Sequence, residues 1–140
     1  MIRAVLDTNI FISGAIVKEG VPGQILEAWL RGEFTLVTSR LILEELKKVF
    51  AYPKIQTKYK IPQADVDDFI QLVEEGSVLT PGRLAVKVVH EDPDDDIIVS
   101  CALEGSADCI VTGDPDLLKI EQHGPIKIIT PRAFLSSLQK

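Results

Sequence analysis

Apolar residues in this chain fall into short unbroken runs and longer runs that repeat with a helical period. The unbroken runs predict strands buried on both faces, because strands with one face in water alternate apolar and polar residues. These candidate strands are residues 4–6, 34–37, 77–80, 84–89, 108–112 and 126–129. The periodic runs predict helices over residues 10–17, 23–31, 40–51, 62–75, 97–104 and 131–138. Strands that alternate with helices predict an α/β fold, a three-layer α/β/α sandwich around a mainly parallel sheet.

Polar residues mark where some of these elements begin. Thr38 or Ser39 is a candidate N-cap for the helix that follows, and Thr130 is a candidate cap for the last helix. Residues 54–60 form a short basic stretch with no clear period. Since no repeat or low-complexity linker interrupts the pattern, we expect one domain over residues 1–140.

Composition narrows the class of protein. The chain has 46% hydrophobic residues and a formal net charge of −6, which favours a soluble globular protein and argues against binding duplex DNA through bulk charge. It has no apolar run long enough for a membrane span and opens directly on a strand, so we expect no membrane association and a cytoplasmic location. Cys101 and Cys109 lie in apolar runs without metal-binding spacing and are expected to be buried thiols.

Two acids follow buried strands. Asp7 ends the first apolar run, and Asp114 stands two residues after Thr112, where another run ends. The carboxyl ends of parallel strands meet at one edge of a sheet, where open α/β proteins bind their ligands. An Asp in such a place is also a common helix N-cap, but two acids at the same edge favour a functional site.

Helical spacing separates two neighbouring glutamates. Glu44 shares its predicted helix face with basic residues and is expected to be solvated. Glu45 lies three residues from Ile42 and four from Val49, on the face turned towards the core. A carboxylate on that face is costly unless something neutralises it, so Glu45 is the better candidate for a site.

Three aspartates at positions 94–96 precede the apolar helix predicted over residues 97–104. The helix dipole favours acids at a helix start, which accounts for one or two of them. Periodicity places Asp96 towards the outer face and does not choose between Asp94 and Asp95.

Carboxylates gathered at one place would repel one another unless cations lay among them. A ligand set of carboxylate oxygens suits Mg²⁺ or Mn²⁺ rather than zinc, and both histidines, His90 and His123, are expected in solvated loops. Two such ions about 3.5–4 Å apart can activate water and stabilise the leaving oxygen in phosphodiester hydrolysis.

A basic stretch follows the glutamates. Between Glu45 and Asp65 there are five lysines and no acid, with Tyr52 and Tyr59 interleaved. One interpretation is a solvated helix and loop. The other is a surface that binds the backbone of a single-stranded nucleic acid and stacks on its bases. The candidate RNA-binding residues are Lys47, Lys48, Lys54, Lys58 and Lys60.

Four segments together resemble the PIN-domain family, and the resemblance covers almost the whole chain. They are Val5-Leu6-Asp7-Thr8-Asn9, residues 39–46 with Glu45-Leu46 at their end, Asp92-Pro93-Asp94-Asp95-Asp96-Ile97 with Ala102 beyond, and Ile110-Val111-Thr112-Gly113-Asp114-Pro115-Asp116-Leu117-Leu118. Each is a weak motif alone, but four in this order and spacing are specific. The family comprises metal-dependent ribonucleases with a parallel sheet between helices, many of them toxins of VapC-type toxin–antitoxin pairs.

The resemblance implies four catalytic acids, Asp7, Glu45, Asp95 and Asp114. Asp95 is preferred because the third acid of the family stands seven residues before a small helix residue, here Ala102, although the aspartate run leaves this ligand open by one position. Asp7 and Asp95 would hold the principal metal ion, and Asp114 would join the cluster or hold a second ion. Glu45 would bind or orient the hydrolytic water. Residues that match supporting positions of the family are Asn9, Thr112 and Asp116.

The predicted activity is therefore a Mg²⁺- or Mn²⁺-dependent endoribonuclease that acts on single-stranded RNA. The resemblance also implies a homodimer and an antitoxin groove on the helices of the first half, with Trp29, Leu30 and Phe50 as candidate contacts. The alternative is a non-catalytic PIN module that binds RNA or a partner protein. A phosphohydrolase of the haloacid dehalogenase type would need a second aspartate at position 9, where this chain has Asn9.

Overall fold

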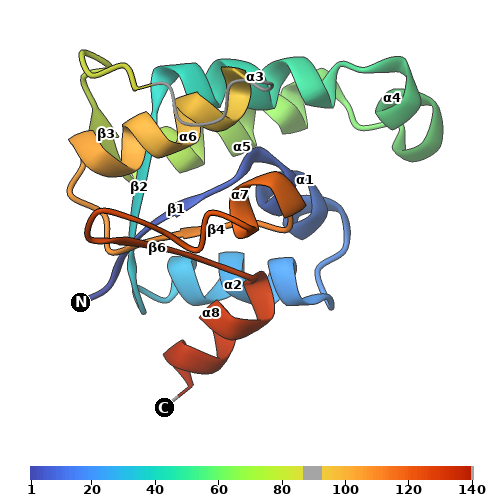
Figure 1. Cartoon of the computed structure of the whole chain (residues 1–140). Helices are drawn as coiled ribbons and strands as arrows, with labels where there is room; N and C mark the ends of the chain where they lie inside the picture. Colours follow the sequence, from blue (N-terminus) through green and yellow to red (C-terminus); the bar gives the residue numbers. More distant parts are fainter. Residues whose placement is uncertain (87–92, 140) are drawn as a thin grey trace.

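A six-stranded sheet forms the centre of the computed structural model, which describes residues 1–86 and 93–139. The strands are β1 (Arg3–Leu6), β2 (Thr35–Ser39), β3 (Val78–Thr80), β4 (Cys109–Val111), β5 (Gln122–His123) and β6 (Ile126–Ile129). Their order in the sheet is β3-β2-β1-β4-β6-β5, so the first strand of the chain lies between two others (Figure 1). Neighbouring strands are parallel except for β5, which runs antiparallel to β6.

Helices cover both faces of this sheet. In the described residues they are α1 (Thr8–Ile16), α2 (Val21–Leu30), α3 (Arg40–Phe50), α4 (Pro53–Tyr59), α5 (Gln63–Glu75), α6 (Pro93–Glu104), α7 (Pro115–Leu118) and α8 (Pro131–Leu138). Figure 1 shows α3, α5 and α6 on one side of the sheet and α2 and α8 on the other. The predicted three-layer α/β/α sandwich with a mainly parallel sheet is confirmed.

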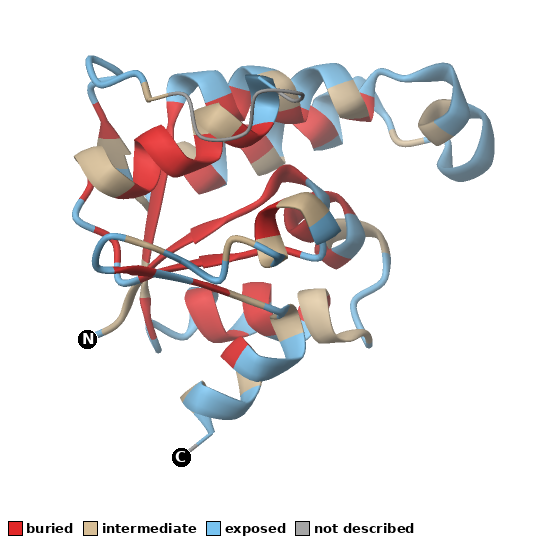
Figure 2. Ribbon diagram, in the orientation of Figure 1, coloured by how far each residue is buried: buried red, intermediate tan, exposed pale blue. Residues whose placement is uncertain are grey.

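The central strand is buried on both faces, as its unbroken apolar run predicts. Ala4, Val5 and Leu6 are all 0% exposed, and Val5 lies in register between Val37 of β2 and Ile110 of β4. Figure 2 shows the buried positions concentrated in the strands and in the helix faces turned towards them. Apolar side chains from both sides of the sheet join one core cluster. Among the described residues, no helix has both the length and the apolar character to cross a membrane.

Both cysteines are buried free thiols, which confirms the prediction. Burial raises the pKa of Cys101 to about 11 and that of Cys109 to about 12, because a thiolate would be poorly solvated in the core. Both thiols are therefore neutral at pH 7 and pack in the core.

Two helices begin at predicted caps. Ser39, rather than Thr38, caps α3, and its Oγ accepts the backbone N–H of Ile42 at 3.3 Å. Thr130 caps α8 through a 3.1 Å hydrogen bond from the N–H of Ala133. Each hydroxyl satisfies a donor that the first helical turn leaves without an intrahelical partner.

The predicted strand at residues 84–89 is wrong in its described part, because residues 84–86 form no strand; the remainder lies outside the described residues. Side chains of helix α6 accept hydrogen bonds from backbone N–H groups in this region, so these groups are not free to pair with a neighbouring strand. Ser100 Oγ accepts the N–H of Val86 at 2.9 Å. The carboxylate of Glu104 accepts three more at 2.7, 2.8 and 3.1 Å, those of Gly82, Arg83 and Leu84.

Helix α6 begins at Pro93, four residues before the predicted start, so all three aspartates lie in its first turn. There they face the positive end of the helix dipole, which favours them. The basic stretch at residues 54–60, for which the sequence predicts no element, is largely the short helix α4.

One prediction for the histidines is wrong, and the other lies outside the described residues. His123 belongs to β5 rather than to a loop, because a tight turn at Gly124, with φ of 58°, folds β5 back onto β6. His90 falls in the segment 87–92 that the structure does not describe.

Candidate active site

Asp7 stands at the carboxyl end of β1, where the chain leaves the sheet and enters α1. Its backbone N–H donates to the carbonyl of Val111 at 3.0 Å, which ties it to the neighbouring strand β4. In the described structure its side chain makes no capping hydrogen bond to α1. Its Oδ2 accepts instead from the hydroxyl of Thr112 at 2.7 Å, and the residue is only 9% exposed. An N-cap role therefore does not account for Asp7.

Thr112 joins two of the acids. It follows β4 directly and is 0% exposed. Its hydroxyl donates to Asp7, and the same oxygen accepts the backbone N–H of Asp114 at 3.0 Å. Because one buried hydroxyl serves both, the ends of β1 and β4 hold their acids at the same edge of the sheet.

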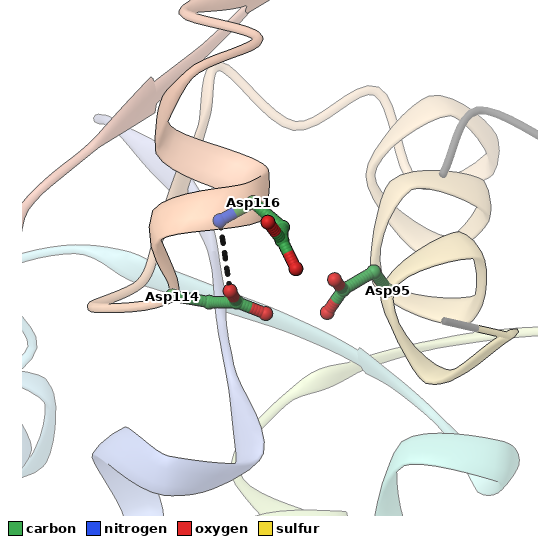
Figure 3. Close-up of side chains that lie close together, drawn as sticks. All are labelled: Asp95, Asp114 and Asp116. Carbon is green, nitrogen blue, oxygen red and sulfur yellow. Dashed lines mark hydrogen bonds between the residues drawn. The ribbon is translucent and has the colours of Figure 1, made fainter. Parts of the chain in front are cut away.

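Asp114 is the N-cap of the short helix α7. Its Oδ1 accepts the backbone N–H of Asp116 at 2.9 Å (Figure 3). This bond brings the first turn of α7, and with it the side chain of Asp116, beside the end of β4. Asp114 therefore caps a helix, a common role of aspartate, and also belongs to an acidic cluster.

Asp95 reaches the same place from the other side, on the first turn of α6. That helix packs against β1, β2 and β4, and Asp95 is 4% exposed. Its two neighbours differ from it: Asp94 is exposed, and Asp96 lines a separate cavity beside the segment that Glu104 binds. Figure 3 shows the carboxylate of Asp95 turned towards those of Asp114 and Asp116.

These three carboxylates form the group best arranged for a cation among the described residues. One oxygen from each of Asp95, Asp114 and Asp116 lies within 4.8 Å of the other two. Oxygens bound to one Mg²⁺ at about 2.1 Å lie roughly 3–4 Å apart, so the group has the scale of a single ion site. Its donors are all carboxylate oxygens, which fits a hard divalent cation such as Mg²⁺ or Mn²⁺.

A cavity of about 360 Å³ opens beside this group and takes in the four acids that the resemblance implies. The acids that line it are Asp7, Glu45, Asp94, Asp95 and Asp114. The rest of the lining consists of Thr8, Asn9, Val49, Tyr52, Lys54 and Ile55. Glu45 is half-buried here and Glu44 is exposed, which confirms the orientations predicted for the two glutamates.

The comparison with known proteins bears directly on this geometry. The family model for the PIN domain matches residues 3–116, a span that includes every acid of the cavity. The chain belongs to the PIN-domain family. It is also similar to the uncharacterized protein MJ1680 of Methanocaldococcus jannaschii, with 29% identity over 147 residues that cover 99% of this chain and 93% of the relative.

PIN domains are generally nucleases that use divalent metals, so family membership and the acidic group together support a nuclease-type function for this PIN domain. Asn9 lies on the rim, where it is exposed, while Thr112 supports the acids from behind. Asp116, which matches a supporting position of the family, is itself one of the three clustered carboxylates. Its side chain is 50% exposed and also contacts Lys119 at 3.6 Å.

The five candidate RNA-binding lysines of this PIN domain do not gather at one place. Lys54 lines the acidic cavity. Lys47 lines a groove on α3 and α5 with Glu44 and Glu74, and Lys58 lies 5.3 Å from the ring centroid of Tyr59. Lys48 and Lys60 are exposed on α3 and after α4.

The candidate partner contacts Trp29, Leu30 and Phe50 do come together. They line a second cavity, of about 400 Å³, with residues of α1 and α5. Trp29 and Phe50 are 7% and 2% exposed, and the indole N–H of Trp29 donates to the carbonyl of Gly76 at 3.0 Å. Leu30 is 61% exposed, so it contributes most of the accessible apolar surface of the three.

Sequence reasoning missed part of the acidic cavity. Val49 and Ile55 line it, and so does Thr8, which directly follows Asp7. Val49 could have been found from helical spacing, since it lies one turn after Glu45 on the same helix face. Ile55 depends on the turn between α3 and α4, for which the sequence carries no equivalent signal.

Proposed function

We propose that this PIN domain is a Mg²⁺- or Mn²⁺-dependent endoribonuclease that hydrolyses phosphodiester bonds of single-stranded RNA. The observation that carries the proposal is the convergence of Asp7, Glu45, Asp95 and Asp114 on one cavity. Four acids from four separate parts of the chain are costly to gather unless cations and substrate phosphate use them.

Each residue of the cavity has a role in this proposal. Asp7, Asp95 and Asp114 hold the metal, with Asp116 as a further oxygen donor from α7. A bound divalent cation supplies charge neutralisation at the phosphate and lowers the pKa of water. Glu45 binds or orients the water that attacks the phosphorus. Asn9 and Thr112 keep the carboxylates in place.

RNA rather than duplex DNA is the proposed substrate because the chain has a net charge of −6 and only local basic surface. The lysines of α3 and α4, together with Lys60 just after α4, would bind the phosphate backbone leading to the cavity, and Lys54 is the one that lines it.

A biological role follows as part of the same proposal. We infer that the protein is the toxin of a toxin–antitoxin pair, acts in the cytoplasm, forms a homodimer and binds an antitoxin protein. The support is the resemblance to VapC-type PIN domains. Expression of the chain alone should arrest growth, and co-expression of the neighbouring reading frame should restore it; growth unaffected by the active nuclease would contradict the toxin role.

The nuclease activity is tested by cleavage of a labelled single-stranded RNA in Mg²⁺, in Mn²⁺ and in EDTA. Glu45→Gln should reduce the rate by about 100-fold, because the group that orients the water is lost, whereas Glu44→Gln, its exposed neighbour, should cleave like the wild type. RNA binding with no cleavage in either metal would instead support the non-catalytic PIN module.

A further inference from the structure

The turn between α3 and α4 brings an aromatic ring and a cation to the acidic cavity. Besides the acids, the lining includes Tyr52, Lys54 and two aliphatic side chains, Val49 and Ile55. Metal binding and water activation need none of these four residues. They give the cavity an apolar and a basic part next to its acidic part.

The backbone of Tyr52 is held firmly at this place. Its N–H donates to the carbonyl of Val49 at 3.1 Å, and its carbonyl accepts the N–H groups of Ile55 and Gln56 at 2.9 and 3.0 Å. Pro53 follows it and restricts it to the extended conformation that it adopts, with φ of −61° and ψ of 135°. The backbone is thus fixed, while the residue is 49% exposed at the cavity.

The second tyrosine of the chain lies in a different environment. Tyr59 is at the far end of α4, where Lys58 Nζ lies 5.3 Å from the centroid of its ring. It does not belong to the lining of the acidic cavity in the described structure. The two tyrosines have similar exposures, 49% and 39%, but of the two only Tyr52 lines the acidic cavity.

We propose that Tyr52 stacks on the base, and Lys54 binds the phosphate, of the nucleotide beside the bond that is cut. The inference rests on the proposed nuclease function and adds to it a subsite for one unpaired nucleotide. An aromatic ring that is half exposed on a fixed backbone is the usual platform for a base, because every base has a π-face. A base in a duplex is stacked on both sides, so the platform accepts only a base that has left its neighbours.

Binding tests the platform separately from cleavage. Each variant is made in the Asp95→Asn background and titrated against a fluorescent single-stranded RNA that carries 2-aminopurine. Tyr52→Leu should weaken binding by about tenfold and reduce the quenching of 2-aminopurine, because the stacked ring is lost. Tyr52→Trp should keep both, and Tyr59→Leu should match its parent. Equal losses in Tyr52→Leu and Tyr59→Leu, with folded proteins by circular dichroism, would overturn the proposal.

The salt dependence of binding tests the phosphate contact. In Lys54→Ala, the negative slope of log binding constant against log salt concentration should become shallower by about 0.7, the value for one phosphate contact on a single strand. Lys127 is an exposed lysine on β6, and Lys127→Ala should leave the slope unchanged. An unchanged slope in Lys54→Ala would remove that residue from the subsite.

Cleavage by the otherwise wild-type enzyme separates the two proposals. The wild type should prefer a single strand over the same strand annealed to its complement, and Tyr52→Leu should lose most of this preference. A wild type that binds RNA through Tyr52 and never cleaves it would refute the nuclease and leave the subsite standing. If the wild type cleaves RNA, and Tyr52→Leu cleaves both the single strand and the duplex at the wild-type rates, the subsite alone would be refuted.

Discussion

At the scale of single residues, Thr112 links two of the acids at the cavity. Its hydroxyl is buried, donates to Asp7 at 2.7 Å and accepts from the backbone of Asp114 at 3.0 Å. A buried hydroxyl with one donor and one acceptor bond fixes the separation of the two groups that it joins. Thr112 thus positions two carboxylates without itself lining the cavity.

We expect Thr112→Val to reduce RNA cleavage by about 10- to 100-fold, because groups that orient metal ligands have effects of this size. Valine keeps the shape of the side chain but leaves the partly buried N–H of Asp114 and a carboxylate oxygen of Asp7 without this partner, which should cost about 1–3 kcal/mol of unfolding free energy. Chemical denaturation and initial rates measure the two effects. Thr130→Val, which removes the cap of α8 at a residue outside the cavity lining, should lower stability by about 1 kcal/mol and leave the rate unchanged. Cleavage preserved in Thr112→Val would show that the link is not needed.

At the scale of elements, α6 carries a site residue at one end and a structural clamp at the other. Asp95 lies in its first turn, and Glu104 in its last turn binds three backbone N–H groups of residues 82–84. Burial raises the pKa of Glu104, but the three N–H donors outweigh it and lower the pKa overall. The clamp therefore works best with the carboxylate ionised.

We expect Glu104→Gln to lower Tm at pH 7, because the amide loses charge-assisted acceptor capacity. The folded pKa of Glu104 lies below its unfolded value of about 4.3, so the unfolded chain binds the proton more readily. Its stabilisation is fully present above that unfolded pKa and is lost as the pH falls through the folded pKa. The Tm difference between wild type and variant should thus shrink below about pH 4 in scanning fluorimetry. A difference independent of pH, or an equal effect of Glu44→Gln, would contradict this account.

The elements also show what the sequence could and could not predict. The unbroken apolar run of β1 is enough to predict a buried strand, and a strand that ends in Asp7 is enough to predict where that acid lies. Helix α6 is different, because it buries Ile98, Val99 and Cys101 on more than one face. Because α6 has no single apolar stripe, the helical period does not show which of the three aspartates faces the core.

Long-range contacts account for the remaining misses. The clamp of Glu104 on Gly82 joins residues 22 positions apart, and a local pattern at residues 84–89 carries no sign of it. Tyr52 and Lys54 belong to a basic stretch for which the sequence supports two interpretations, because only the direction of the chain after α3 decides which of its residues reach the acids.

At the scale of the whole molecule, the fold brings three carboxylates from separate elements to one place. Asp95, Asp114 and Asp116 come from α6, β4–α7 and α7, and their oxygens lie within 4.8 Å of one another. A cation that binds this group binds the folded state only, since the unfolded chain holds the three carboxylates apart. Metal binding should therefore stabilise the entire domain.

We expect Mn²⁺ at 100 times its Kd to add about 2.7 kcal/mol to the free energy of unfolding, which corresponds to a rise in Tm of roughly 5–10 °C. Asp95→Asn should lose most of this rise, because it removes the negative charge and one of the two oxygens of a buried ligand. Asp96→Asn, which lines the other cavity, should keep it. A Tm insensitive to Mn²⁺ in the wild type, or a larger loss in Asp96→Asn than in Asp95→Asn, would exclude the assigned cluster.

The pairing of β1 with β4 has a consequence for the order of events during synthesis. Asp7 is translated more than a hundred residues before Val111, yet its N–H donates to the carbonyl of Val111 and its carboxylate accepts from the hydroxyl of Thr112. Strand β1 gains that neighbour only after more than a hundred further residues have been translated. A nascent chain that lacks β4 therefore lacks the hydrogen bonds that hold Asp7, and the acidic cavity can form only after residues 109–114 have been translated.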